Sequence, residues 1–536
     1  MAVRHVISGG TKTSGNSTAD DWTAANCYPT VATAIAASGI AAGDELILEH
    51  MQTHVVTAMI AKALGIVGSY VVRGRFARIN NLVEPTSVIS GSSSDGALFL
   101  FNDTVNRADI EFSDLKFTKS VTHTDATRPY ILHAAQKTGD ITFTRCWIKG
   151  VTVAISGATS YELGAINYAA SPTAPATISY NYLTFEDITG TFGTGGACLL
   201  SNNGYAAGTY KYTGMVMRRL SMTTGGAGYY FSVNSTGSCT VNGFDVEDAV
   251  GVSTHTAGFG SIFIRAGTGF FRVRNIKLKN IAHTAPYCDA AFAVYSPHDI
   301  DNVLGINVRL DSTTHNGTSG IGCLVAAFLG KLGQTRNVRA YRCLSKFGTA
   351  VYYSNGANGI VDNVWAEECE CGNGIFYKGG DGDVAWSNLV AVNNIHADNI
   401  GDTSASLVFY GHNGGSVYTR NAVLGVRNLI SVGNTIHAGS IPVSFAEIVG
   451  TYTLDVIARD LTIREASSNG GISIRIGTVN VDLNIANSNL AGTISNAGLG
   501  SITESGTTDT DVVIVGGLSM NTELDDRWPV AYRAAA

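Results

Sequence analysis

The chain has 536 residues, a net charge of −7 at pH 7 and a pI near 5.9. This acidic balance argues against a basic surface that neutralises nucleic-acid phosphates, so we expect no nucleic-acid partner. Glycine is abundant, at 62 residues, while charged residues make up only 14%, against roughly 25% in a typical domain. This composition is typical of β structure with many turns.

Residues 1–50 are predicted to form an N-terminal cap. A short amphipathic helix is expected after Pro29, because apolar residues follow at helical spacing and the pattern ends at Gly39. A strand from Glu45 to Glu49 comes next. These two elements would cover the open end of a solenoid, whose terminal coil otherwise exposes its core and its backbone edge.

The start of the chain, MAVRHVISGGTKTSG, has no apolar stretch of signal-peptide length. No window elsewhere is apolar over the length that crosses a bilayer, so we expect no membrane partner and synthesis in a cytoplasm. The nine cysteines are then expected to be mostly buried free thiols. Cys343 and Cys369 hold the same place in successive repeats, so we expect them to stack.

Residues 51–515 carry an internal repeat, most visible in VRNIKL, IDNVLG, TRNVRA, VDNVWA, WSNLVA and TRNAVL. The spacing of the aligned central positions averages (489 − 114)/12, or about 31 residues, which is one long coil of a solenoid. The thirteen central positions are Asp114, Cys146, Tyr182, Arg219, Gly243, Asn275, Asn302, Asn337, Asn363, Asn388, Asn421, Asp460 and Asn489.

Most of these central residues are Asn, Asp or Gly, which tolerate the left-handed conformation that a sharp bend requires. The residue after each is apolar, as expected if it points inward. Stacked Asn amides are expected to bond from coil to coil. We therefore predict an all-β, right-handed parallel β-helix solenoid with a short N-terminal capping helix. Its structural turn ladder comprises Asn275, Asn302, Asn337, Asn363, Asn388 and Asn421.

Each coil also has a second apolar run before a Gly-rich turn, as in AVYYSNG and GIFYKGG. Tyr353, Tyr377 and Tyr410 are predicted to hold one place in this run, and Tyr295 holds it two coils earlier. If the rings point outward they form a ladder suited to sugar faces, and if they point inward they stack in the core. These four tyrosines are the candidate ligand-binding residues.

The repeat stops after residue 515, where the sequence becomes polar with single aromatic residues. The predicted divisions are therefore a cap at 1–50, a parallel β-helix at 51–515, and a C-terminal cap or docking tail at 516–536.

Glycan cleavage on such a scaffold needs two carboxylates about 5 to 9.5 Å apart. Three acidic groups are candidates, although solvated loops and strand edges explain them more simply, and the catalytic residues stay unassigned. The histidines are dispersed, so no metal and no cofactor are expected. The acidic groups are Asp245, Glu247 and Asp248, then Glu367, Glu368 and Glu370, then Asp381 and Asp383.

The segment DDWTAANCYPTVATAIAASGIAAGDELIL and the Asn-punctuated coils resemble the pectin-lyase-like right-handed parallel β-helix superfamily. Within it they are similar to phage virion proteins of the tail-spike, fibre and decoration type. The resemblance covers about residues 20 to 515 and implies a homotrimer. The polygalacturonase-like enzymes of the superfamily carry Asn-Thr-Asp, Asp-Asp, Gly-His-Gly and Arg-Ile-Lys elements, of which this chain has only partial matches, at Gly411-His412-Asn413 and Arg274-Asn275-Ile276-Lys277.

From this resemblance we expect a non-catalytic bacteriophage virion surface protein: a fibre, a spike or a capsid decoration. It would be made in the host cytoplasm and released by lysis, with other virion proteins and host-surface polysaccharide as partners. The solenoid begins almost at the first residue, which favours a fibre or decoration over a spike. Two alternatives stay open: a glycan-degrading tail-spike depolymerase, acting as hydrolase or lyase, and a bacterial extracellular β-helix protein.

Overall fold

The structure is a computed structural model whose described residues form two compact units. Unit 1 lies within Met1–His255, and unit 2 lies mainly within Phe270–Arg527. No helix in the described part is long and apolar enough to span a membrane. The described residues are 2–37, 43–57, 60–61, 70–75, 84–91, 99–101, 109–123, 132–134, 140–155, 166–168, 177–194, 197–202, 208–235, 237–255, 258–266, 270–288, 290–295, 298–314, 323–328, 333–347, 351–355, 359–372, 374–379, 384–397, 405–411, 422–447, 454–466, 471–476, 481–496 and 502–505.

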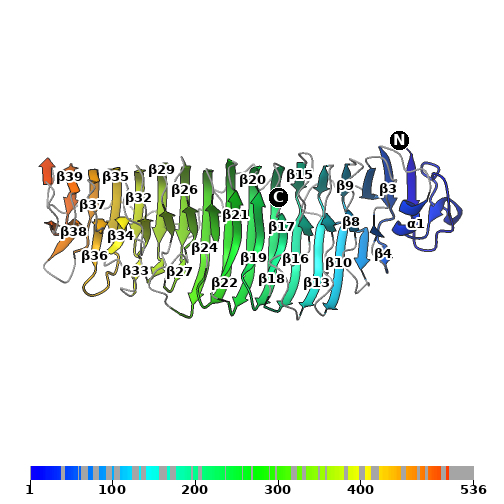
Figure 1. The fold of residues 1–536 in the computed structure, drawn as a ribbon, viewed down its shortest axis with the longest axis horizontal. Helices are drawn as coiled ribbons and strands as arrows, with labels where there is room; N and C mark the ends of the chain where they lie inside the picture. Colours follow the sequence, from blue (N-terminus) through cyan, green and yellow to red (C-terminus); the bar gives the residue numbers. More distant parts are fainter. Residues whose placement is uncertain are drawn as a thin grey trace. The chain divides into compact units, whose positions relative to one another are not determined.

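Unit 1 is a stack of coils in which each strand pairs in parallel with the equivalent strand of the next coil (Figure 1). The strands of its larger sheet are β1 (Val3–Val6), β2 (Cys27–Tyr28), β3 (Asp44–Leu48), β4 (Thr53–Val56), β6 (Tyr70–Gly74), β7 (Val88–Gly91), β9 (Ile110–Ser113), β10 (Lys116–His123), β12 (Ile141–Thr144), β13 (Trp147–Ile155), β15 (Thr177–Asn181), β16 (Thr184–Phe192), β18 (Thr209–Thr224) and β20 (Ser238–Ser253). Those of its smaller sheet are β5 (Ile60–Ala61), β8 (Phe99–Phe101), β11 (Leu132–Ala134), β14 (Ile166–Tyr168), β17 (Ala197–Asn202) and β19 (Gly228–Ser235).

Unit 2 repeats the same arrangement with parallel pairing between successive coils. One sheet contains β22 (Phe271–Ala285), β24 (His298–Ser312), β26 (Gly333–Tyr341), β27 (Leu344–Ser345), β29 (Gly359–Glu367), β30 (Glu370–Cys371), β32 (Val384–Val392), β33 (Ile395–His396), β35 (Ala422–Val432), β37 (Leu454–Ile463), β39 (Val481–Ala486), β40 (Asn489–Leu490) and β42 (Ile502–Ser505). The other contains β21 (Phe259–Ala266), β23 (Phe292–Tyr295), β25 (Val325–Phe328), β28 (Tyr352–Asn355), β31 (Phe376–Gly379), β34 (Ala405–Gly411), β36 (Ile441–Glu447), β38 (Ile472–Ile476) and β41 (Thr493–Asn496). The predicted all-β parallel β-helix is confirmed.

Each coil of the larger sheet turns at a left-handed residue that we call the first bend. A second left-handed residue, the second bend, follows five positions later in most coils. The first bends of unit 1 are Asp114, Arg145, Tyr182, Gly214 and Gly243, and its second bends are Gly150, Asp187, Arg219 and Asp248. The first bends of unit 2 are Asn275, Asn302, Asn337, Asn363, Asn388, Asn428, Asp460 and Asn487, and its second bends are Asn280, Asn307, Arg342, Glu368, Asn393 and Gly433.

Three predicted bend positions differ from the structure. The bend assigned to Cys146 lies at Arg145, because the Cys146 side chain is buried in the core. Arg219 is left-handed but belongs to the second bend, and Gly214 makes the first bend of that coil. A Cβ at Gly214 would clash with the Tyr182 ring in the neighbouring coil, so stacking on Tyr182 requires glycine there. The last bend is at Asn487, two residues before the expected Asn489.

The core is built from inward columns that repeat at every coil. In unit 1 four aromatic rings stack in register, with centroids 5.1, 5.6 and 5.3 Å apart, from Phe112 through Phe143 and Tyr180 to Tyr212. In unit 2 the residue after the first bend is a buried aliphatic in successive coils, and burying each contributes about 1.5–3 kcal/mol. These residues are Ile276, Val303, Val338, Val364, Leu389, Leu429 and Leu461.

The N-terminal cap contains the predicted helix as α1 (Val31–Ala36), preceded by the short 3-10 helix η1 (Ala24–Asn26). Thr30 and Thr33 form a capping box at the start of α1, which satisfies free backbone donors there. Its end is held by the buried Arg4 guanidinium, whose Nη1 donates to the carbonyls of Ala34 and Ala37 at 2.7 and 2.9 Å. The helix thereby lies against β1 (Figure 1).

Candidate functional site

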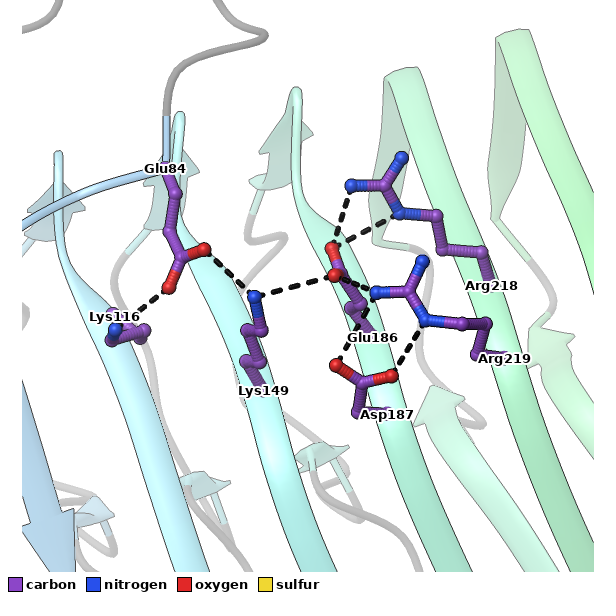
Figure 2. Close-up of polar contacts among 7 residues, drawn as sticks. All are labelled: Glu84, Lys116, Lys149, Glu186, Asp187, Arg218 and Arg219. Atoms are coloured by element: carbon purple, nitrogen blue, oxygen red, sulfur yellow. Dashed lines mark hydrogen bonds and ion pairs between the residues drawn. The ribbon is translucent and has the colours of Figure 1, made fainter.

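Between the two bends each coil has four residues, of which the first and third point inward and the second and fourth outward. We call the two outward positions of successive coils the narrow face. In unit 1 this face carries a cluster of charged side chains, which Figure 2 shows. Its residues are Lys116, Thr118, Trp147, Lys149, Thr184, Glu186, Val216, Arg218, Asp245 and Glu247.

Ion pairs connect four coils across this face (Figure 2). Glu84, from the segment before β7, accepts hydrogen bonds from Lys116 Nζ at 2.7 Å and from Lys149 Nζ at 2.8 Å. Lys149 Nζ also lies 3.3 Å from Oε1 of Glu186. Arg218 donates to Oε2 of Glu186 from Nε at 3.0 Å and from Nη2 at 2.7 Å. The pairs therefore form one continuous network.

The residues at the fourth position after the first bend, which point outward, explain this network. Lys149, Glu186, Arg218 and Glu247 are in register on β13, β16, β18 and β20, so opposite charges alternate at the strand spacing of about 4.8 Å. Only 3% of the Glu186 side chain is exposed, and Arg219 of the second bend also contacts its carboxylate. One buried carboxylate thus balances three cations.

The electrostatics of the network lower the pKa values of two of its carboxylates, Glu84 and Asp187. Burial raises the pKa of Glu84, but hydrogen bonds from Lys116 and Lys149 outweigh it, and the net pKa lies below the ordinary value. Hydrogen bonding to Arg219 lowers the pKa of Asp187. A glycosidase needs a carboxylic acid whose pKa is raised, so that it donates a proton near neutral pH. These two carboxylates are therefore poorly suited to acid catalysis.

An aromatic residue completes the charged face. Trp147 is buried beside Lys149 Nζ and Arg218 Cζ, which lie 5.6 and 5.4 Å from its ring. Both distances are within the range of a cation–π contact. The arrangement holds the cations in place on β13 and β18 and stabilises the register between coils.

The narrow face of unit 2 has the opposite character. Over five coils, eight of its ten residues are apolar or aromatic, and only Arg339 and Glu367 are charged. In unit 1, six of the ten equivalent residues are charged. The ten residues of unit 2 are Leu304, Ile306, Arg339, Tyr341, Trp365, Glu367, Val390, Val392, Ile430 and Val432.

The predicted tyrosine ladder is only partly in register. Tyr353 pairs with Tyr377 on β28 and β31. Tyr353 also pairs with Ala326 on the preceding strand, whereas Tyr295 pairs with Phe328, two positions beyond Ala326. Tyr377 pairs with Val408, and Tyr410 lies where the register shifts between β31 and β34. The prediction of one column through all four residues was wrong, because loops of different length and this irregularity change where each strand begins. The side chains of Tyr353, Tyr377 and Tyr410 lie outside the described residues.

The Asn turn ladder is present as a column of left-handed residues, with φ between 54° and 64° from Asn275 to Asn388. Its amides bond between coils as expected: Asn302 Nδ2 donates to Asn275 Oδ1 at 2.8 Å, and Asn363 Nδ2 donates to Asn337 Oδ1 at 2.6 Å. Between the other coils of this column, the Asp side chain one residue before the bend accepts the hydrogen bond instead of the Asn. These are Asp301, which accepts from Asn337, and Asp362, which accepts from Asn388.

The ladder continues at Asn428, whose Nδ2 donates to Asn388 Oδ1 at 2.8 Å. Asn421, the predicted bend of this coil, lies outside the described residues. β35 runs from Ala422 to Val432 and contains the left-handed Asn428. The inward residue after this bend is Leu429.

The candidate acidic groups do not form a shared site in the part of the chain that the structure describes. Asp245, Glu247 and Asp248 lie on β20 in unit 1. Glu367 ends β29 and is buried, while Glu368 is left-handed at the second bend and pairs with Arg342 at 2.7 Å. The chain bends between these two residues, so they do not lie in one strand. Asp381 and Asp383 lie outside the described residues.

Polar groups buried inside unit 2 were missed from the sequence. The His283 ring lies 3.2 Å from Ser261 Oγ, and burial lowers its pKa to about 3. Asn434 donates to Glu465 from its backbone and its side chain, at 2.8 and 3.0 Å. Burial raises the pKa of Glu465. The sequence signal for His283 is a polar residue at a position that holds Leu310 in the next coil.

The thiols match the prediction. All nine cysteines are buried and free, and the β27–β30 register places Cys343 beside Cys369. The described residues include no group of three or more His, Cys, Asp or Glu side chains arranged to hold a metal ion. No protein-family model matches this chain, and no curated protein matches it. An inference about the function of the chain therefore rests on its fold and on the contacts between its coils.

Proposed function

We propose that the chain is a non-catalytic structural protein of a bacteriophage virion surface, acting as a fibre, spike or capsid decoration. It would belong to the pectin-lyase-like superfamily, assemble as a homotrimer with other virion proteins, and contact host-surface polysaccharide. The proposal is supported by polar side chains that form hydrogen bonds and ion pairs from one coil to the next. Carboxylates, guanidiniums and amides on the bends and narrow face of unit 1 and on the bends of unit 2 bond to the next coil.

This pattern supports a structural role because the charged groups are committed to holding coils together. The network around Glu186 involves seven charged side chains from four coils and a preceding segment (Figure 2). Two of its carboxylates have lowered pKa values, whereas hydrolysis of a glycan requires a proton donor. A stable scaffold that carries a binding surface is the simplest use of such a fold.

Particle association tests the proposal directly. Particles purified on a density gradient, from cultures that express the gene natively, are analysed by mass spectrometry. We expect peptides of this chain to band with the major capsid or tail proteins in constant ratio. Recovery only in the fractions without particles contradicts the virion assignment.

A glycan panel tests the non-catalytic assignment separately. The purified chain is incubated with capsular and lipopolysaccharide glycans of the host. We expect no new reducing ends and no unsaturated-uronate absorbance. Either product would show a hydrolase or a lyase, and would favour the depolymerase over the structural protein.

A further inference from the structure

We propose that Glu465, which ends a buried ladder of hydrogen bonds in unit 2, acts as a proton-operated latch on the coils of β35 and β37 (Figure 1). With a proton on its carboxyl group these coils are more stable, and with the carboxylate ionised they open more readily. The inference goes beyond the proposed function, because it concerns how the scaffold responds to pH. It starts from polar side chains that lie inside the coils.

The ladder runs through the inward residues that follow the second bends. In the first coils of unit 2 this position holds the buried aliphatic residues Ile281 and Val308, whereas later coils have the buried Asn394 and Asn434. The Oδ1 atom of Asn394 accepts from the backbone N–H of Cys369 at 2.8 Å, and Oδ1 of Asn434 accepts from the backbone N–H of Asn394 at 2.9 Å. Each amide thus satisfies a buried backbone donor of the preceding coil, which is costly to leave unpaired.

Glu465 takes the place of an asparagine at the end of this ladder. It lies one position closer to its bend at Asp460 than Asn434 lies to the bend at Asn428, and its longer side chain makes up the difference. Its Oε1 accepts from the backbone N–H and from Nδ2 of Asn434, at 2.8 and 3.0 Å. Its Oε2 accepts from Ser431 Oγ at 2.9 Å. All the donors to this carboxylate are therefore neutral groups.

The Glu465 carboxylate is buried without an opposite charge in the part of the chain that the structure describes. The charged and titratable side chains beside it in the chain, on β38 and in the segment after Asn434 are Arg464, Arg475 and His437, and none of the three forms an ion pair with it. Among the described side chains, β36 and β40 carry no charge. A buried charge without a counter-ion is costly, so burial raises the pKa of Glu465 although its hydrogen bonds oppose this shift.

A proton on Oε2 leaves the ladder intact. The Ser431 hydroxyl rotates and accepts a hydrogen bond from the carboxyl group in place of donating one, while Oε1 still accepts from Asn434. Because the folded-state pKa of Glu465 is raised, the folded chain holds a proton that the unfolded chain releases between the two pKa values. The contribution to stability is therefore fully present below the unfolded pKa of about 4.3 and is lost as the pH rises through the folded pKa.

E465Q tests the latch, because glutamine has the same shape without the charge. We expect its Tm to exceed that of the wild type by about 2–4 °C at pH 8 and to match it within about 1 °C at pH 4. His283 titrates in both proteins, so its effect cancels in the difference. Hydrogen exchange followed by mass spectrometry, with both proteins at the same pH, locates the change. At pH 8 the amides of β35 and β37 should exchange severalfold more slowly in E465Q, and those of unit 1 at an equal rate.

E370Q is the matched control, because Glu370 is a partly exposed glutamate on β30 of the same unit. Its Tm should differ from that of the wild type by the same amount at both pH values. S431A provides a second test in case E465Q does not fold. It removes a hydroxyl that donates to the ionised carboxylate, and hydrogen bonds to charged groups are the stronger ones, so its loss of Tm should be larger at pH 8 than at pH 4.

Three results would overturn the inference. They are an E465Q chain that is less stable than the wild type at pH 8, a difference in Tm between these two proteins that is equal at both pH values, and an E370Q chain with the same pH dependence as E465Q. If E465Q does not fold, an equal loss by S431A at both pH values overturns it. The particle and glycan tests of the proposed function are independent of these outcomes.

Discussion

The narrow faces of the two units are built at the same positions between the same two bends, yet one is charged and the other apolar. In unit 1 the column through Lys149, Glu186 and Arg218 links coils by ion pairs. In unit 2 the equivalent outward positions include Val390 and Ile430, and the coils are linked instead by amides at the first bend. In both units the residue after the first bend is buried and apolar from Leu115 to Leu461, so the fold constrains this inward position and leaves the outward positions free to vary.

The two ways of linking neighbouring coils have different consequences for the surface. The first bends of unit 1 are of mixed type, with Arg145 donating to Asp114 at 2.8 and 2.7 Å and glycine at Gly214 and Gly243. The Asn amides of unit 2 bond at the bend itself, to the Asn of the neighbouring coil or to the Asp before it. Coils of unit 2 are thus linked beside the narrow face, whereas coils of unit 1 are linked across it.

The largest expected effect comes from removing the central carboxylate of the charged face. E186Q keeps the shape of the side chain but leaves Lys149, Arg218 and Arg219 without their shared anion. We expect the free energy of unfolding to fall by about 2–3 kcal/mol, because a buried charge partner is lost. Denaturant titration followed by circular dichroism measures the change.

The matched control is D187N, whose side chain is 42% exposed and pairs with Arg219. Since exposed pairs contribute about 0.2–1 kcal/mol, it should lose less than 1 kcal/mol. Equal losses for the two variants would mean that the charged face does not stabilise unit 1 through its buried carboxylate.

A smaller effect on the free energy of unfolding is expected when the pH is lowered, because unit 2 contains the buried His283. Because burial lowers the pKa of His283 to about 3, against about 6.5 when unfolded, the unfolded chain binds a proton that the folded chain does not between these pH values. Stability is therefore full above pH 6.5 and falls as pH decreases, by about 2 kcal/mol between pH 6.5 and 5.

H283L tests this titration, since Leu310 holds the same column in the next coil. The variant should lose about 2 kcal/mol less than the wild type over that pH interval, whatever its stability at neutral pH. The same pH dependence in both proteins would show that His283 is not the buried proton acceptor.

The smallest effects are expected at Asn363, which donates a hydrogen bond to the neighbouring coil and adopts the left-handed backbone of the bend. N363A loses the amide bond to Asn337 and places alanine, which tolerates the left-handed region less well than asparagine, at φ 54°, so we expect a loss of about 2 kcal/mol. N363G keeps the left-handed conformation and loses only the bond, so about 1 kcal/mol is expected. Thermal unfolding in parallel compares them; a glycine variant as unstable as the alanine variant would argue against a conformational contribution.

The fold was predictable because its signal repeats. Asn or Asp at the bend followed by an inward aliphatic residue appears from Asn275 to Asn388, and the structure places these residues at first bends. Prediction failed where the bend has no characteristic residue. Arg145 and Gly214, the two bends that were missed in unit 1, share only their backbone conformation, which depends on pairing with neighbouring coils and not on side-chain type.

The candidate sites were harder to predict because they depend on register. The four tyrosines were aligned on a similar sequence, but loop lengths and one register shift move Tyr295 and Tyr410 out of that column. The charged column was missed for the same reason. Counted from the correct bends, Lys149, Glu186 and Arg218 all lie four residues later, so their alternating charge becomes visible only after the bends are known.

The most direct test of the contrast between the two faces is the free energy of unfolding of the wild-type chain and of E186Q at about 0.1 M and about 1 M salt. Salt reduces the range of charge interactions from about 10 Å to about 3 Å but does not weaken apolar burial. If ion pairs across the narrow face link the coils of unit 1, the loss caused by E186Q is smaller at about 1 M salt than at about 0.1 M. A loss of equal size at both salt concentrations would contradict the account.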